Sequence, residues 1–79
     1  MVRVENIVVK DGEFSFDYYP ENKNIKHFFK YDTNQKRVIE HEKSKEYSSD
    51  IYAKHGFIYV KRLIENKKEI PKCQIIAWY

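Results

Sequence analysis

The chain has 79 residues, of which 42% are apolar and 34% are charged, and its formal net charge is +3. This length allows one domain, residues 1–79, and the mixture of apolar and charged residues excludes the composition of a disordered chain. A single cysteine excludes both an intramolecular disulfide and a cluster of zinc-binding thiolates.

The N-terminal stretch Val2-Arg3-Val4-Glu5 lacks the long apolar region of a signal peptide. No apolar run approaches the roughly 20 residues that a membrane-spanning helix needs. We therefore expect a cytoplasmic protein that does not associate with a membrane.

The first two predicted strands form a hairpin. Met1–Lys10 is rich in β-branched residues, and Glu13–Tyr19 alternates between apolar and polar side chains. Asp11-Gly12 lies between them and favours a type I′ turn, because both residues tolerate a positive φ. The residues expected to face the core are Phe14, Phe16 and Tyr18. Pro20–Asn24 ends the second strand, since Pro20 has no N–H to donate.

Two further strands follow, at Ile25–Asp32 and, with a weaker pattern, at Arg37–Glu42. The turn between them is Thr33–Lys36. In the third strand, one face is expected to carry Ile25, His27, Phe29 and Tyr31. The opposite face is expected to carry Lys26, Phe28, Lys30 and Asp32.

The only sustained helical periodicity runs from Ser48 to Asn66, and Ser48-Ser49-Asp50 supplies a cap signal. The start is open to several residues, because Lys43–Tyr47 could also be helical. At 100° per residue, one face of this helix is apolar and is expected to cover the sheet. Its residues are Ala53, Gly56, Phe57, Val60, Leu63 and Ile64.

Lys72–Tyr79 is predicted to be a fifth strand, which pairs beside the first. Because it is so apolar, we expect it to pair on both sides and to lie under the helix, with Cys73 buried as a small hydrophobic residue. The predicted fold is α+β, with a mostly antiparallel sheet of about five strands and one helix on one face. The other face is expected to be open and to carry Tyr19, Phe28 and one of Ile76 or Trp78.

No motif for catalysis, a cofactor or a metal stands out. His27, His41 and His55 lack the spacing that places two ligands on one helical face, although His27 and His41 could meet across a strand pair. The chain has no Gly-x-Ser-x-Gly elbow and no glycine-rich phosphate loop. We therefore expect a non-enzymatic protein without a cofactor or a bound metal.

One surface of the predicted helix is a candidate for association with a protein. Two isoleucines seven residues apart lie on the side away from the apolar face, with tyrosine and arginine beside them, and these residue types are enriched at interfaces. The strip comprises Ile51, Tyr52, His55, Ile58, Tyr59 and Arg62. Alternatively, the helix is tilted, or Lys43–Tyr47 folds over Ile51.

A second set of residues suggests weak nucleic-acid binding, because aromatic rings on a sheet can stack on bases while ammonium groups contact phosphates. These residues are Lys26, Phe28, Lys30, Lys54, Lys61 and Arg62. The alternative is that the aromatic residues of the third strand belong to the core and that Lys26 and Lys30 are charges that discourage edge pairing.

Part of the chain resembles a group of small uncharacterised proteins of low-GC Gram-positive bacteria and their mobile elements. The resemblance rests on Tyr52, His55, Gly56, Val60, Leu63, Pro71 and Trp78-Tyr79, together with the stretch Phe16–Pro20. Gly56 departs from the alanine that is more usual in the group. No activity is established for the group, so the resemblance implies no site.

These patterns favour a small protein-interaction module, with a homodimer as one option, that uses the open sheet face or the helix strip. The alternative is a weak nucleic-acid binder. The sequence alone does not identify the partner.

Overall fold

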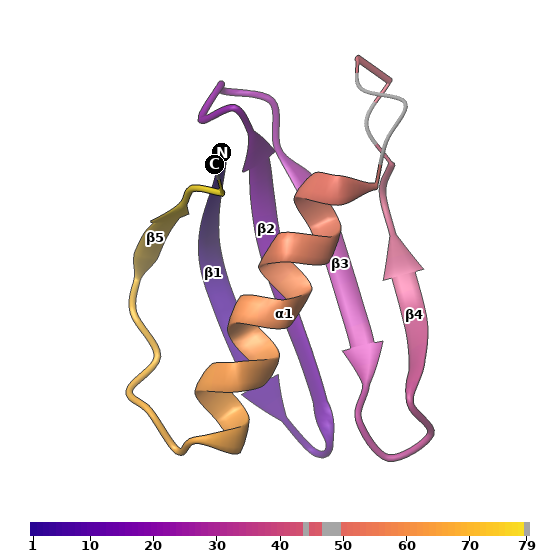
Figure 1. The fold of residues 1–79 in the computed structure, drawn as a ribbon. Helices are drawn as coiled ribbons and strands as arrows, with labels where there is room; N and C mark the ends of the chain where they lie inside the picture. Colours follow the sequence, from indigo (N-terminus) through magenta and orange to yellow (C-terminus); the bar gives the residue numbers. More distant parts are fainter. Residues whose placement is uncertain (44, 47–49, 79) are drawn as a thin grey trace.

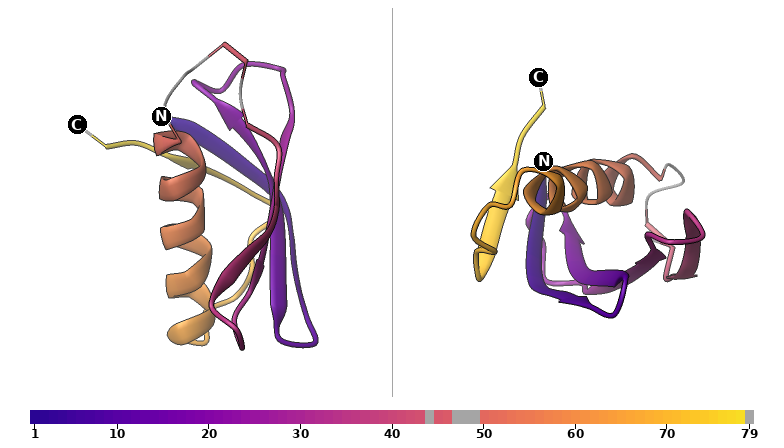
Figure 2. Two further views of the ribbon diagram at one scale, coloured as in Figure 1. Left: turned by 90° about the vertical axis from the view of Figure 1, so that its right-hand side faces the viewer. Right: turned by 90° about the horizontal axis from the view of Figure 1, so that it is seen from below.

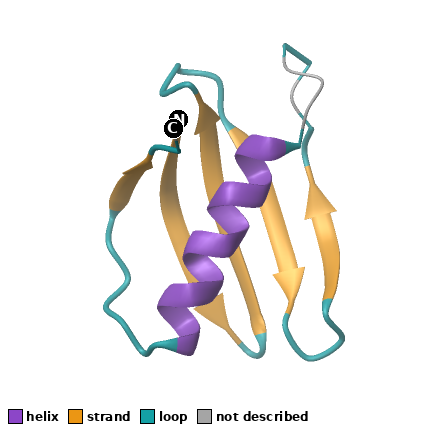
Figure 3. Cartoon of the chain, in the orientation of Figure 1, coloured by secondary structure: helices purple, strands orange, loops and turns teal. Residues whose placement is uncertain are grey.

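The computed structural model describes residues 1–43, 45, 46 and 50–78, and confirms the predicted α+β fold (Figure 1). Within these residues the elements are β1 (Val2–Lys10), β2 (Glu13–Pro20), β3 (His27–Asp32), β4 (Arg37–His41), α1 (Ile51–Glu65) and β5 (Cys73–Ile76). The strands form one sheet in the order β4-β3-β2-β1-β5, with every neighbouring pair antiparallel. The helix lies against one face of this sheet (Figures 2 and 3).

The hairpin between β1 and β2 is confirmed. Lys10 pairs with Glu13, and the two turn residues Asp11 and Gly12 have φ values of 52° and 78°. Two consecutive positive φ values match the twist of a type I′ turn to that of the flanking strands. The Asp-Gly pair therefore sets the register of this hairpin.

The core lies between α1 and the sheet, and its main residues are those that the two periodicities predict. From the strands come Val2, Val4, Phe14, Phe16, Tyr18 and Phe29, and from the helix come Ala53 and Val60. Gly56 is buried between them, and Phe57 and Ile64 pack against the cluster at its border. The predicted sheet-facing stripe of the helix is therefore the one that packs.

The boundaries of three elements differ from the prediction. β3 begins at His27, and Ile25 is 57% exposed in the preceding connection. Since Tyr18 pairs with His27, Ile25 would lie opposite Pro20, which has no N–H to extend the ladder. β4 ends at His41. The helix begins at Ile51, whereas Ser48 and Ser49 of the expected cap lie outside the described residues.

The prediction for the last strand is wrong in its position, although its pairing with β1 is confirmed. β5 pairs with β1 alone and forms an edge of the sheet, where Cys73 is exposed and Ile75 is 46% exposed. Only four residues pair, and α1 does not lie over them (Figure 1). Ile76 and Trp78 both pack against the core cluster, so neither lies on the open face.

The contact between α1 and the sheet depends on Gly56. A Cβ atom at this position would lie 2.8 Å from Cε2 of Phe16 and 3.4 Å from Cγ2 of Val4. Both side chains are fully buried, so neither can easily move away. Glycine therefore allows the helix to approach β1 and β2 more closely than any other residue would.

We expect Gly56→Ala to lower the free energy of unfolding by about 1 kcal/mol in urea denaturation. The new Cβ overpacks the contact with Phe16, at a cost of about 1–3 kcal/mol, which outweighs the gain of about 1 kcal/mol in helix propensity. In a Phe16→Leu background the same change should cost less, because the ring that it meets is gone. A net stabilisation by Gly56→Ala alone would contradict the close approach.

Candidate functional site

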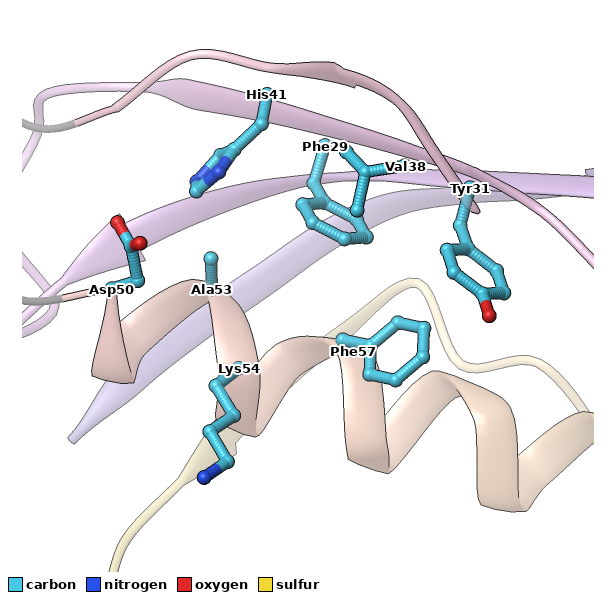
Figure 4. Close-up of a pocket in the computed structure, with 8 residues that line it drawn as sticks. All are labelled: Phe29, Tyr31, Val38, His41, Asp50, Ala53, Lys54 and Phe57. Carbon is cyan, nitrogen blue, oxygen red and sulfur yellow. The ribbon is translucent and has the colours of Figure 1, made fainter. Parts of the chain in front are cut away.

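A groove separates α1 from the outer part of the sheet. The helix begins beside the end of β4, runs obliquely across the sheet and ends near β1, so it diverges from the β3–β4 hairpin along its length (Figures 1 and 2). The space between them measures about 320 Å³. Its lining residues are Phe29, Tyr31, Val38, His41, Asp50, Ala53, Lys54 and Phe57 (Figure 4).

Most of the groove wall is aromatic. Phe57 meets Phe29 at a centroid distance of 5.8 Å and Tyr31 at 4.7 Å, and both pairs are close to perpendicular, at 62° and 68°. Phe29 and Tyr31 reach the groove because they alternate along β3 on the face toward the helix, and Ala53 and Phe57 follow one another along one side of α1. Val38 of β4 adds an aliphatic side chain to the wall, and this residue is 51% exposed.

A β-bulge in β4 brings Val38 and His41 to the same side of the sheet. Tyr31 pairs with Val38 and Lys30 pairs with Glu40, so Ile39 is an extra residue in the ladder. Two residues three positions apart in a regular strand would point to opposite faces. Nothing in the alternation of Arg37–Glu42 indicates the bulge, so this groove cannot be predicted from the sequence pattern.

One end of the groove is polar. The Tyr18 hydroxyl lies 2.8 Å from Nε2 of His41 and donates a hydrogen bond of 2.9 Å to the carbonyl oxygen of Glu42. A carbonyl can only accept, so the single hydroxyl proton goes to Glu42 and His41 donates its Nε2–H to the hydroxyl oxygen. These bonds tie β2 to the end of β4 and fix the position of the groove wall there.

Burial changes the titration of both partners. It raises the pKa of Tyr18 to about 12, and the negative charges of Asp50 and Glu42 contribute to the rise. Burial also lowers the pKa of His41, an effect that nearby Lys43 and His27 strengthen and Asp50 opposes. At neutral pH the phenol is therefore protonated, so it can donate to Glu42, and the imidazole is uncharged.

The structure divides the predicted helix strip. Trp78 stacks on His55 with a centroid distance of 3.9 Å and an interplanar angle of 10°, and it meets Tyr52 edge-on at 5.7 Å. The C-terminal segment thus packs against that part of the strip. The other members are Ile51 at the start of α1 and Ile58, Tyr59 and Arg62 farther along it.

The residues considered for nucleic-acid binding do not form one surface. Phe28 and Lys30 lie on the sheet face away from the helix, where Lys30 forms an ion pair of 3.2 Å with Glu13. Lys54, Lys61 and Arg62 are on the helix, and Lys61 lies 5.8 Å from the centre of the Phe57 ring. Lys26 is exposed in the connection before β3. The sheet therefore separates the two groups.

The open sheet face is polar and internally bonded. Asn6, at a bulge in β1, donates a hydrogen bond of 2.7 Å to Asp17. Arg3 bonds to Asn22 at 2.6 Å, and its guanidinium lies 4.1 Å from the centre of the Tyr19 ring. Val8 and Ile75, which pair with Ser15 and Arg3, are exposed on the same face, so the polar bonds cover only part of it.

No protein-family model matches the chain, and no curated protein or solved structure gives a match. Among the described residues, no three His, Cys, Asp or Glu side chains gather in a group that could hold a metal ion. The described part of the chain also contains no helix with the length and apolar character needed to cross a membrane.

We expect Tyr18→Phe to lower the free energy of unfolding at neutral pH by about 1 kcal/mol, because the His41 and Glu42 groups lose their partner. The difference should shrink as the pH rises from 10 toward 12. The unfolded chain releases the tyrosine proton near 10.0, whereas the folded protein holds it until about 12, so alkali favours unfolding of the wild type. Urea denaturation of both proteins across this range measures the effect, and a difference that does not change with pH would contradict it.

Proposed function

We propose that this protein is a small non-enzymatic interaction module, which binds a protein segment in the groove between α1 and the β3–β4 part of the sheet. The observation that carries the proposal is an aromatic wall beside a half-exposed Val38, on a part of the sheet that the helix does not cover. Aromatic side chains and concave apolar surfaces are enriched where proteins bind one another.

The dimensions of the groove favour this role. A volume of about 320 Å³ lies at the low end of the range for binding pockets, and it suits one or two apolar side chains of a partner. Phe29 is held by contacts with Phe16 and Phe57, so the wall is already formed before a ligand binds. A preformed site avoids the entropic cost of ordering side chains on binding.

The partner is a different protein or a second copy of this chain. A second copy is one option because Val38 and Ile39 are exposed together on the outermost strand β4. The bulge at Ile39 disrupts the regular ladder that direct pairing of two β4 edges would need. The groove, and not the strand edge, is therefore the surface that we assign to binding.

Selection from a displayed library of random peptides tests the proposal. We expect wild-type protein to enrich peptides with a large apolar residue at one position, and we expect Val38→Asp to lose their binding at least tenfold, because a charge on the groove wall must be desolvated. Val8→Asp is the matched control, since Val8 is 53% exposed but lies on β1 away from the groove.

Peptides that bind wild type and Val8→Asp, but not Val38→Asp, support the groove as the site. Equal binding to all three proteins, or a failure to enrich any peptide, would overturn the proposal. Circular dichroism and elution volume of each variant would establish that the fold and the oligomeric state are retained.

A further inference from the structure

The groove has two chemically different ends. One end is apolar and is lined by Phe29, Tyr31, Phe57 and Val38, whereas Asp50 and His41 lie at the other end (Figure 4). His41 is there hydrogen-bonded to Tyr18. A ligand that fills the groove lengthwise would therefore meet an apolar wall and a carboxylate together. This arrangement restricts what kind of partner segment can bind.

Asp50 is not used as a helix cap in the usual way. It occupies the N-cap position of α1, where an aspartate side chain normally accepts a hydrogen bond from a backbone N–H of the first turn. Here its φ and ψ are −82° and 11°, and its side chain makes no capping bond. The carboxylate instead points toward the strand that carries His41 (Figure 4).

Among the described residues near Asp50, the two polar side chains of the groove end already use their hydrogen-bond donors on each other and on the backbone. Tyr18 donates its hydroxyl hydrogen bond to the Glu42 carbonyl, and His41 donates its Nε2–H hydrogen bond to the Tyr18 oxygen. The Lys54 side chain points away from the strands (Figure 4), and the positive charge of Lys43 acts on His41. Burial is the main cause of the raised pKa of Tyr18, and the carboxylates of Asp50 and Glu42 add to it, so two acidic side chains act on this end of the groove.

We infer that the partner segment presents a cationic group next to its apolar side chain, and that Asp50 accepts a hydrogen bond from this cation. The cation is a lysine, an arginine or a free N-terminal amine of the partner. The aromatic wall adds to the preference, because the faces of aromatic rings attract cations as well as apolar groups. This inference rests on the proposed function and names the chemistry of its ligand.

Three small probes of similar size separate the contributions of charge and apolar contact. Phenethylamine, phenethyl alcohol and hydrocinnamate share a phenyl ring and carry a positive, a neutral and a negative group. Binding of each is followed by the chemical shifts of the backbone amides of Val38, Ala53 and Phe57 in the intact protein. We expect the amine to bind up to about fivefold more tightly than the alcohol, as is typical of an exposed ion pair, and the carboxylate to bind most weakly.

Asp50→Asn should abolish the preference for the amine over the alcohol, because asparagine keeps the size and capping ability of aspartate but not its charge. Glu65→Gln is the matched control, since it removes one negative charge from the exposed far end of the same helix. This control should retain the full preference.

The outcomes distinguish the two claims. Loss of the preference in Asp50→Asn, but not in Glu65→Gln, supports the inference. Equal binding of amine and alcohol to the wild type, or an unchanged preference in Asp50→Asn, would overturn it while leaving the groove as an apolar site. If none of the probes shifts the groove amides, both the inference and the proposed function are wrong.

Discussion

The close contact between Gly56 of α1 and the ring of Phe16 on β2 is the constraint on which the rest of the structure depends. With no Cβ between them, the helix backbone rests directly on β1 and β2. Ala53 and Val60, one turn away on either side, complete a narrow line of buried helix residues. Because α1 packs through this single line of residues, it covers β1 and β2 and leaves parts of β3 and β4 uncovered.

The groove is a consequence of this position of the helix on the sheet. The helix diverges from β3 and β4, so Phe29 is buried whereas Tyr31 and Val38, farther along the hairpin, are covered only in part. The bulge at Ile39 directs Val38 and His41 to the same side, and the bonds from Tyr18 to His41 and Glu42 hold the end of β4 in place. The aromatic wall at the border of the core thus has an edge that a partner can contact.

The sequence predicted the layers well because both periodicities are strong. Alternation identified Phe14, Phe16 and Tyr18 as inward-facing, and helical spacing identified Ala53, Gly56 and Val60 as the packing stripe. It failed where a local irregularity or a long-range contact decides the outcome. The alternation of apolar and polar residues in β4 does not indicate the bulge at Ile39. The apolar C-terminal segment has the same composition whether it lies in the centre of a sheet or, as observed, at its edge with Trp78 packed on His55.

If α1 lies on β1 and β2 and leaves the groove beside β3 and β4 open, Val38 must be accessible to solvent while Val4 and Val60 are not. Methyl NMR with a soluble nitroxide, which broadens the signals of atoms that it can approach, measures this difference. We expect strong broadening of the Val38 methyl signals, little broadening for Val4 and Val60, and an NOE between the Gly56 α-protons and the Phe16 ring. If Val38 were as protected as Val60 and this NOE were missing, the helix would lie elsewhere on the sheet and the groove would be closed.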